Sequence, residues 1–347
     1  MVKKKNRWWR FGFPFFMGCI TALTLSSALH AASSSPQKIG ILWWNVENLF
    51  DTQDDPAKRD EDFTPNGKLQ WSEKKLYLKQ MRIRDLLGAL AADKQMGSLP
   101  DIIGFAEVEN KTVFEQTLQG VKTGSYKSVY YNSRDPRGID VALAYNSATL
   151  KLQHSKAYSV PLKHPTRPVV VASFMVGRHP LHLLLNHWPS RAFDAELSEP
   201  NRIAAATIAR HIVDSLLTAN PKADVVVMGD MNDEATNRSL ANTLGSSMDG
   251  VQVKAAKGKL LYNCWSGYNG IGSYYYRSKW QKIDHMLLTH GMLDRTGFYV
   301  TKEAFRCIDY PALLKSSGKG TWSTYEKRVY KGGYADHLPL YLKVSVE

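Results

Sequence analysis

The sequence predicts an α/β fold in which mixed β-sheets are layered with helices in one domain, residues 38–347. Short apolar runs of strand type recur along the whole chain, and two amphipathic helical patterns lie between them. Several runs are continuously apolar, as expected for strands covered on both faces. The expected strands are 39–44, 101–106, 129–131, 141–145, 169–175, 182–185, 224–228, 285–288 and 338–344.

The two expected helices have recognisable ends. The first follows Ser72, which can cap its N-terminus, and extends to about Lys94. The second opens with Ser198-Glu199-Pro200 and ends before Pro221. Each has one apolar stripe, formed by Leu76, Ile83, Leu86, Leu87 and Leu90 in the first and by Ile208, Ile212 and Leu216 in the second.

Residues 1–31 are predicted to be a secretory signal peptide. A basic head precedes an apolar stretch from Phe11 to Leu29, and small residues follow, with cleavage expected after Ala31 or Ala32. The alternative is an uncleaved N-terminal anchor, because the stretch is near the length that spans a bilayer. No later apolar run approaches that length. We therefore expect an exported protein, periplasmic or extracellular, that is monomeric and has no stable membrane insertion after cleavage.

The composition excludes several classes of protein. With 44% hydrophobic and 22% charged residues, the chain is neither disordered, collagen-like nor a coiled coil. The whole chain carries a formal charge of +13, and residues 1–31 contribute five bases and no acid, so the mature chain keeps +8. Such an excess suits a polyanionic partner such as nucleic acid or an anionic membrane. The alternative is a solvated surface that only maintains solubility.

Only three cysteines are present, which excludes a disulfide scaffold or a cysteine-rich zinc protein. Cys19 lies in the expected signal peptide, so the exported chain keeps Cys264 and Cys307. An even pair in an oxidising compartment predicts a disulfide bond. The alternative is two buried free thiols.

Polar residues lie directly before or after several of the expected strands. In a layered α/β fold such side chains share one cleft. Carboxylates and carboxamides without a thiolate select Mg²⁺, Mn²⁺ or Ca²⁺ rather than zinc. Any single one of them could be a cap or a surface residue. The set is Asn45-Val46-Glu47, Glu107, Asn186-His187, Gly229-Asp230-Met231-Asn232, Ile283-Asp284 and Asp336-His337.

In this order, the motifs resemble those of the endonuclease/exonuclease/phosphatase superfamily, the deoxyribonuclease-I-like metal-dependent phosphoesterases. The resemblance extends from about Ile39 to Val344. It implies a four-layer sandwich, two packed mixed β-sheets flanked by helices, and metal-dependent cleavage of phosphoester bonds with Mg²⁺, Mn²⁺ or Ca²⁺.

The resemblance also implies a role for each matching residue. Glu107 is the principal metal ligand, assisted by Asn45 and Glu47. Asp336 completes the metal site or orients the neighbouring His337. His337 acts on the attacking water or the scissile phosphate, and Asp284 holds its ring. Asp230 and Asn232 contact the nucleophile and the phosphate oxygens, and His187 is the acid for the leaving oxygen. The candidate substrate-binding residues are Asn186, Arg137 and Arg191.

Two positions depart from the family pattern. Ala335 stands where many relatives have Ser, which removes one phosphate hydrogen bond, and Glu47 stands where others often have Asp. An aromatic, glycine-rich segment from Tyr262 to Trp280 precedes Asp284. It is either a stacking platform or wedge for a substrate, or a hairpin whose rings pack against the sheet.

The leading hypothesis is a secreted or periplasmic, divalent-metal-dependent phosphodiesterase, an endonuclease that hydrolyses DNA or RNA. The alternative is a phospholipid head-group phosphodiesterase similar to sphingomyelinases, which would need an exposed apolar loop. A third hypothesis is a non-catalytic binding protein on the same fold. The intact set of Glu107, His187, Asp230, Asn232 and His337 argues against it.

Overall fold

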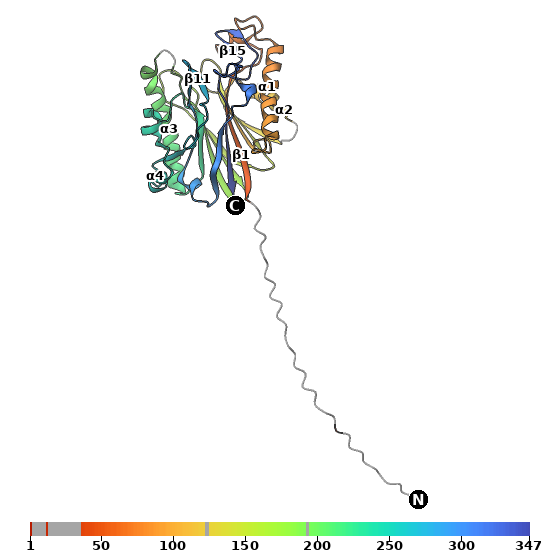
Figure 1. Ribbon diagram of the computed structural model, residues 1–347, viewed down its shortest axis with the longest axis vertical. Coiled ribbons are helices and arrows are strands. Elements are labelled where there is room, and N and C mark those ends of the chain that lie inside the picture. The colour runs from red at the N-terminus through yellow and green to blue at the C-terminus, as the bar shows by residue number, and fades with distance from the viewer. Residues whose placement is uncertain (2–11, 13–35, 122–124, 192–193) are drawn as a thin grey trace. The chain divides into compact units, whose positions relative to one another are not determined.

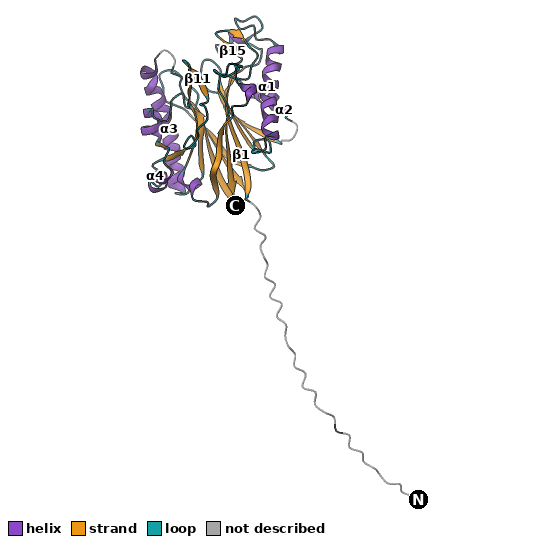
Figure 2. Ribbon diagram, in the orientation of Figure 1, coloured by secondary structure: helices purple, strands orange, loops and turns teal. Residues whose placement is uncertain are grey.

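Two mixed β-sheets pack face to face in the computed structural model, and helices cover the outer face of each (Figures 1 and 2). This is the four-layer sandwich expected from the sequence. The structure describes residues 1, 12, 36–121, 125–191 and 194–347, and Pro36–Glu347 form one unit. The predicted signal peptide and its cleavage site lie outside the described residues, apart from Met1 and Gly12. Among the described helices, none has the length and apolarity needed to cross a bilayer.

The first sheet has six strands in the order β14-β17-β1-β2-β4-β3. Strands β1 and β2 are parallel, and the other neighbours are antiparallel. Helices α1 (Glu73–Ala92) and α2 (Lys111–Gln119) lie on its outer side (Figure 1). The strands are β1 (Gln37–Leu49), β2 (Ile102–Val108), β3 (Tyr126–Tyr130), β4 (Asp140–Asn146), β14 (Phe298–Cys307) and β17 (Leu340–Val346).

The second sheet has seven strands in the order β5-β6-β7-β8-β13-β10-β9. Strands β7 and β8 are parallel, as are β9 and β10. Helices α3 (Ala195–Ala219) and α4 (Gly250–Ala255) lie on its outer side. The strands are β5 (Lys151–Tyr158), β6 (Val169–Val176), β7 (His179–His187), β8 (Val225–Asp230), β9 (Ser246–Ser247), β10 (Leu261–Asn263) and β13 (Asp284–Leu288).

Two small hairpins stand outside these sheets. One pairs β11 (Tyr274–Tyr276) with β12 (Lys279–Gln281), and the other pairs β15 (Tyr325–Glu326) with β16 (Val329–Tyr330). The remaining elements are a π-helical turn at Ser239–Leu244 and short 3₁₀ turns at Glu61–Phe63, His290–Leu293 and Pro311–Leu313.

The core between the sheets is formed by the apolar strand residues. Gly104 of β2 marks a close approach, because a Cβ atom there would lie 2.9 Å from the Met228 methyl group of the opposite sheet. Trp43 is fully buried in β1, and its Nε1 donates to Asp284 Oδ1 of the other sheet at 3.0 Å. A buried indole N–H needs such a partner, so this bond ties the two sheets together where polar residues begin.

All nine expected strands are present, several of them longer than predicted. Four strands of the two sheets, β5, β9, β10 and β14, were not predicted. Strands β5 and β14 are edge strands whose exposed polar residues hide the apolar pattern, and β9 and β10 have only two and three residues. The predicted start of the second helix is wrong. Helix α3 begins at Ala195, because Asp194 Oδ1 accepts the N–H groups of Glu196 and Leu197 at 2.8 and 2.9 Å, and Pro200 lies within the helix.

The predicted disulfide bond is not formed in this structure. Cys264 follows β10 of the second sheet and Cys307 ends β14 of the first, and both are buried free thiols. Burial raises the pKa of each thiol above its ordinary value. The prediction failed because an even count of cysteines says nothing about whether their side chains meet.

Candidate active site

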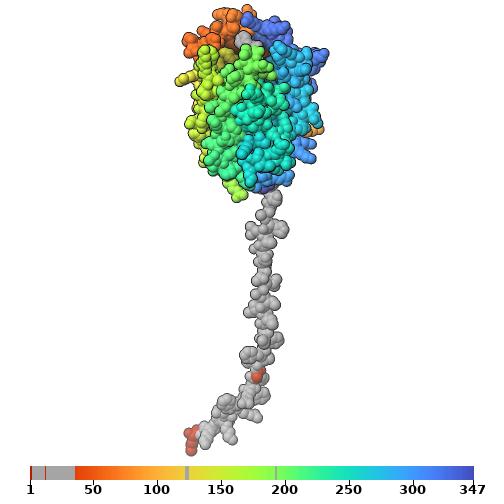
Figure 3. Space-filling model, turned by 90° about the vertical axis from the view of Figure 1, so that its left-hand side faces the viewer, coloured from red at the N-terminus to blue at the C-terminus, as the bar shows by residue number. Residues whose placement is uncertain are grey.

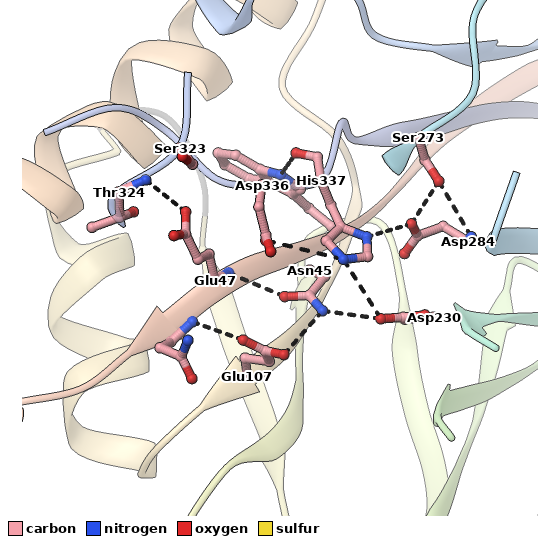
Figure 4. A network of polar contacts seen from close by, with 12 residues as sticks. Asn45, Glu47, Glu107, Asp230, Ser273, Asp284, Ser323, Thr324, Asp336 and His337 are labelled. Atoms are coloured by element: carbon pink, nitrogen blue, oxygen red, sulfur yellow. Dashed lines mark hydrogen bonds and ion pairs between the residues drawn. The ribbon is translucent and has the colours of Figure 1, made fainter. Parts of the chain in front are cut away.

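The polar strand ends from both sheets meet at one end of the sandwich (Figure 4). The parallel pair β1 and β2 carries Asn45 beside Ala106, the residue before Glu107. The parallel pair β7 and β8 carries His187 beside Asp230. Each sheet therefore contributes one pair of parallel strands, and the ends of these strands bring together residues that are far apart in the sequence.

His337 and Asp284 form a hydrogen-bonded pair that several further hydrogen bonds hold in place. Their Nδ1 and Oδ2 atoms are 2.7 Å apart. Ser273 Oγ donates to the same carboxylate oxygen at 2.7 Å, and Trp43 holds the other oxygen. On the opposite side, Trp44 Nε1 donates to the His337 carbonyl at 2.9 Å. The imidazole is thus fixed, and its Nε2 is directed at the other acids of the site (Figure 4).

Asp230 lies between two imidazoles. Its Oδ2 is 3.8 Å from Nε2 of both His187 and His337. Asn45 Nδ2 donates to Oδ2 at 3.1 Å, and Asn232 N donates to Oδ1 at 2.9 Å. Burial and the neighbouring Asp284 raise the pKa of Asp230 to about 7. This is the pKa range in which a carboxylate can exchange a proton at neutral pH.

The two histidines have opposite electrostatic environments. Burial alone would lower the pKa of His337, but Asp284, Asp336 and Asp230 outweigh it and hold that pKa well above its usual value. Burial lowers the pKa of His187, and the positive charges of Arg167 and Arg137 lower it further. The surroundings of His337 therefore favour its charged form, and those of His187 favour its neutral form. The role of His187 as the acid for the leaving oxygen stays a prediction.

Glu107 is partly open to solvent, with 17% of its side chain exposed, and Asp336 is more open, at 41%. Its Oε2 accepts from Asn48 N at 3.0 Å, and its Oε1 lies 3.3 Å from Asn45 Nδ2. Asp336 is close enough that Glu107, after burial, raises its pKa. Two neighbouring carboxylates with spare lone pairs are a donor set that fits a hard divalent cation.

A second group of side chains also lies close enough to hold a metal ion. Its members are Asp230, Asp284 and His337, whose ligand atoms lie within 4.8 Å of one another. However, His337 Nδ1 is bound to Asp284, and both Asp284 oxygens already accept hydrogen bonds. We therefore infer that the two aspartates of this group hold the His337 imidazole and do not bind a metal ion. The Glu107 and Asp336 carboxylates remain the better candidates for a metal.

The backbone is strained where these residues lie. Glu47, Asn48, Glu107 and Asn232 have φ angles of 53°, 58°, 65° and 52°. Non-glycine residues seldom adopt this left-handed conformation, and such outliers gather at functional sites. Glu47, Asn48 and Glu107 lie within β1 and β2, at the points where the pairing register of these strands shifts.

Two predicted metal ligands, Glu47 and Asn45, form hydrogen bonds within the protein, and their role toward a metal stays a prediction. Both oxygens of Glu47 accept backbone N–H groups, from Thr324 at 2.6 Å and Tyr325 at 2.9 Å. Asn45 Oδ1 accepts from Glu47 N at 3.0 Å, so its amide nitrogen faces the acids. Glu47 is thus an anchor for the segment that precedes Asp336, and Asn45 is a bridge between carboxylates.

Asn186, a predicted substrate-binding residue, lies in the protein interior. Asn186 is fully buried, its Nδ2 donates to Leu184 O and Met228 O, and its Oδ1 accepts from Trp188 Nε1 at 3.0 Å. Arg191 contacts Gln281 of β12. Arg137 is 48% exposed and near enough to His187 to affect its pKa. Of the predicted substrate-binding residues, Arg137 is therefore the one that is exposed and also affects the electrostatics of His187.

Sequence reasoning missed three residues beside the site. Arg167 is buried, with Nη1 2.7 Å from Asp135 Oδ2 and Nη2 2.8 Å from Trp188 O. Lys79 of α1 is buried and donates to Thr324 Oγ1 and Tyr334 O, both at 2.5 Å. Burial lowers its pKa to about 8, opposed by Glu47, Asp336 and Glu107. Both are charged residues in stretches that read as ordinary polar surface, so no sequence signal marked them.

The third missed residue comes from the aromatic segment. Tyr274 of β11 pairs with His337 through an isolated backbone bridge, and the two ring centroids are 4.6 Å apart. Burial, and then the charges of Asp336 and Asp230, raise the pKa of Tyr274. The rest of the segment divides: Trp265 and Tyr268 pack in the core, while Tyr276 is exposed. The packed-hairpin interpretation holds for Trp265 and Tyr268, and a substrate contact by the segment stays a prediction.

Comparisons with known proteins show the family and the fold of this chain. A model of the endonuclease/exonuclease/phosphatase family matches residues 40–346. No curated protein sequence matches significantly. Among solved structures, a humanized form of TDP2 from D. rerio has a TM-score of 0.56 at 14% identity, over 88% of this chain and 98% of that one. The human Nocturnin catalytic domain with bound sulfate has a TM-score of 0.53 at 14% identity, over 90% and 94%. A family protein from Bacteroides thetaiotaomicron has a TM-score of 0.52 at 13% identity, over 90% and 100%.

Proposed function

Because this chain belongs to the endonuclease/exonuclease/phosphatase family, a group of generally metal-dependent phosphoesterases, we propose that it is an exported nuclease that hydrolyses phosphodiester bonds of DNA or RNA. One structural neighbour supports the choice of nucleic acid: a D. rerio TDP2 structure is described as complexed with a single-strand DNA product. The net positive charge of the chain points the same way.

The observation that carries the proposal is the fixed His337 imidazole. With Nδ1 held by Asp284 at 2.7 Å, its Nε2 faces Asp230 and Asp336 at 3.8 and 4.0 Å. A cationic imidazole so placed can donate to an oxygen of the scissile phosphate. Asp230, held by Asn45 and Asn232, is the group placed to take a proton from the attacking water. A binding protein would need neither arrangement.

A divalent cation fits the remaining acids. Glu107 and Asp336 would hold it, with Glu107 as the principal ligand, and Mg²⁺, Mn²⁺ and Ca²⁺ all suit oxygen ligands. When bound, the cation neutralises charge that develops on the phosphate oxygens. The chain adds its own positive charges on the side of His187, where Arg167 and Arg137 lower the pKa of that imidazole.

A plasmid assay tests the proposal directly. Purified mature protein should nick or linearise supercoiled plasmid with Mg²⁺ or Mn²⁺ and should leave it intact with chelator. Phosphatidylcholine and sphingomyelin vesicles, assayed in parallel, test the phospholipid alternative. Release of phosphorylated head groups with intact plasmid would replace the nuclease proposal by that alternative. No hydrolysis of either substrate with any divalent metal would favour the binding protein.

Export is proposed on the sequence pattern of residues 1–31 alone. The test is to express the full chain in a Gram-negative host, fractionate the cells, and sequence the N-terminus of the product. We expect a periplasmic or extracellular product that begins at Ala32 or Ser33. A full-length product in the membrane fraction would show that the segment is an uncleaved anchor.

A further inference from the structure

The β15–β16 hairpin is attached directly to the candidate active site. The N–H groups of Thr324 and Tyr325, at the start of the hairpin, bind both oxygens of Glu47 at 2.6 and 2.9 Å. Lys79 fixes the same place through Thr324 Oγ1. The chain then returns from the hairpin to Asp336 and His337. The base of the hairpin therefore borders the candidate active site.

The hairpin is also held rigidly on helix α1. Lys75 Nζ lies 4.8 Å from the centre of the Tyr330 ring and 5.8 Å from that of Tyr325. The Arg82 guanidinium lies 4.5 Å from the ring of Trp322. Cations over aromatic faces attract them, so the rings hold the hairpin against α1. These aromatic faces are thereby occupied, and the tip of the hairpin is what remains available to a partner.

Two basic residues form that tip in a conformation that does not suit them. Lys327 and Arg328 are the two central residues of the turn, with φ angles of 47° and 70°. A two-residue turn with both φ angles positive favours Asn-Gly, because residues with longer side chains are strained there. Both side chains are exposed, and neither forms an ion pair among the described residues. The turn therefore places two exposed basic side chains at the tip of the hairpin.

Charge is distributed unevenly around the hairpin. Residues 315–335 contain five bases and one acid, Glu326, which is already paired with Lys315 at 2.5 Å. The neighbouring loop 51–62 contains six acids and two bases. The two segments lie side by side at the top of Figure 3, dark blue and orange. A polyanion leaving the site is therefore attracted over the hairpin and repelled by the loop.

We infer that the tip of the β15–β16 hairpin binds backbone phosphates of a nucleic acid strand beyond the bond that is cleaved. This inference rests on the proposed function and deepens it, since it requires a substrate of several nucleotides. Lys327 and Arg328 contact phosphates without reading bases, so the contact is independent of sequence. Each contact releases a condensed counterion, so it contributes most at low salt.

The test replaces the tip without disturbing the turn. In the double variant Lys327→Asn with Arg328→Gly, both charges are removed and the favoured Asn-Gly turn is introduced, so the thermal midpoint should not fall. The matched control is Lys254→Asn with Lys257→Gly at the end of α4, away from β15 in Figure 1. Lys257 also has a positive φ, 46°, so the control removes equal charge and relieves strain at one of its two positions.

Binding of a single-stranded oligonucleotide of about 20 nucleotides is measured by fluorescence anisotropy, with chelator present and salt varied. The hairpin variant should bind several-fold more weakly at low salt, and its slope of log K against log salt should fall by about 1.4 for two lost contacts. The control variant should match the wild type. All three proteins should hydrolyse bis(4-nitrophenyl) phosphate at the same kcat/KM, because that ester is too small to reach the tip.

Three outcomes would overturn the inference. The first is an unchanged oligonucleotide affinity in the hairpin variant, and the second is an equal loss of affinity in the control variant. The third is a hairpin variant that loses binding to phosphatidylglycerol vesicles alone, which would make the tip a membrane contact. These results are separate from the proposed function, which fails if the wild-type protein hydrolyses neither plasmid nor oligonucleotide. A wild-type enzyme that cleaves both while the hairpin variant binds normally would keep the function and remove only this surface.

Discussion

The two ends of strand β8 carry buried aspartates with the same perturbation and different surroundings. Burial raises the pKa of Asp230 and of Asp224 to about 7. Asp230 accepts two hydrogen bonds and faces two imidazoles. Asp224 accepts one, from Phe298 N at 2.9 Å, and its other oxygen has no partner among the described residues. A raised pKa therefore reports burial, and only the neighbouring groups make a carboxylate suitable for catalysis.

The largest effect is expected from Asp230→Asn. The amide keeps the shape of the side chain but cannot take a proton from water, so kcat should fall by about 10²- to 10⁴-fold. Added Mg²⁺ should not restore it, because the change leaves Glu107 and Asp336 intact. The measurement is kcat on one oligonucleotide across a metal titration. Activity close to that of the wild type would mean that Asp230 is not the base.

A smaller effect is expected from Glu107→Gln, which separates metal binding from proton transfer. A neutral amide is a poorer ligand than a carboxylate for a hard cation, so the variant should need more metal. Raising Mg²⁺ or Mn²⁺ should recover part of its activity, in contrast to Asp230→Asn. The concentration of metal at half-maximal rate is the quantity to compare. If it does not move, Glu107 is not the principal ligand.

An intermediate loss is expected from Asp284→Asn. The His337 ring would remain but would lose the charged partner that is 2.7 Å from its Nδ1 and that helps to raise its pKa. The rate should lie between those of the wild type and His337→Ala, whose own loss should not respond to metal. The pH profile gives an independent readout, since any limb that reports the His337 cation should shift to lower pH. An unchanged profile would show that Asp284 only packs against the ring.

Glu47→Gln should affect stability more than metal demand. A Gln side chain has one acceptor oxygen for the N–H groups of Thr324 and Tyr325, so one buried donor would lose its partner, at a cost of about 1–3 kcal/mol. The free energy of unfolding from urea titration measures this. The same variant separates the two interpretations of Glu47, because a direct ligand would raise the metal requirement without lowering stability.

The sequence predicted the parts of the site that depend on local pattern. Glu107, His187 and Asp230 follow continuous apolar runs, and the order of the motifs matched one family. The sequence could not show that Glu47 meets the N–H groups of residues 324 and 325, because that contact joins distant segments through a hairpin. Lys79 was hidden for the same reason: its buried partners Thr324 and Tyr334 lie on that distant segment.

The smallest effect on catalysis is expected from Asp224→Asn, at the other end of β8. Its folded pKa of about 7 lies above the unfolded value of about 4, so the folded state holds the proton more tightly. The contribution of this group to stability is therefore complete below about pH 4 and is lost as the pH rises through about 7. The Asn variant has no such proton, so its stability should fall less than that of the wild type between these pH values, while kcat stays unchanged. Thermal melting of both proteins across this range is the measurement. If the two curves run parallel, Asp224 does not titrate there. If kcat falls as it does for Asp230→Asn, the distinction between the two ends of the strand is lost.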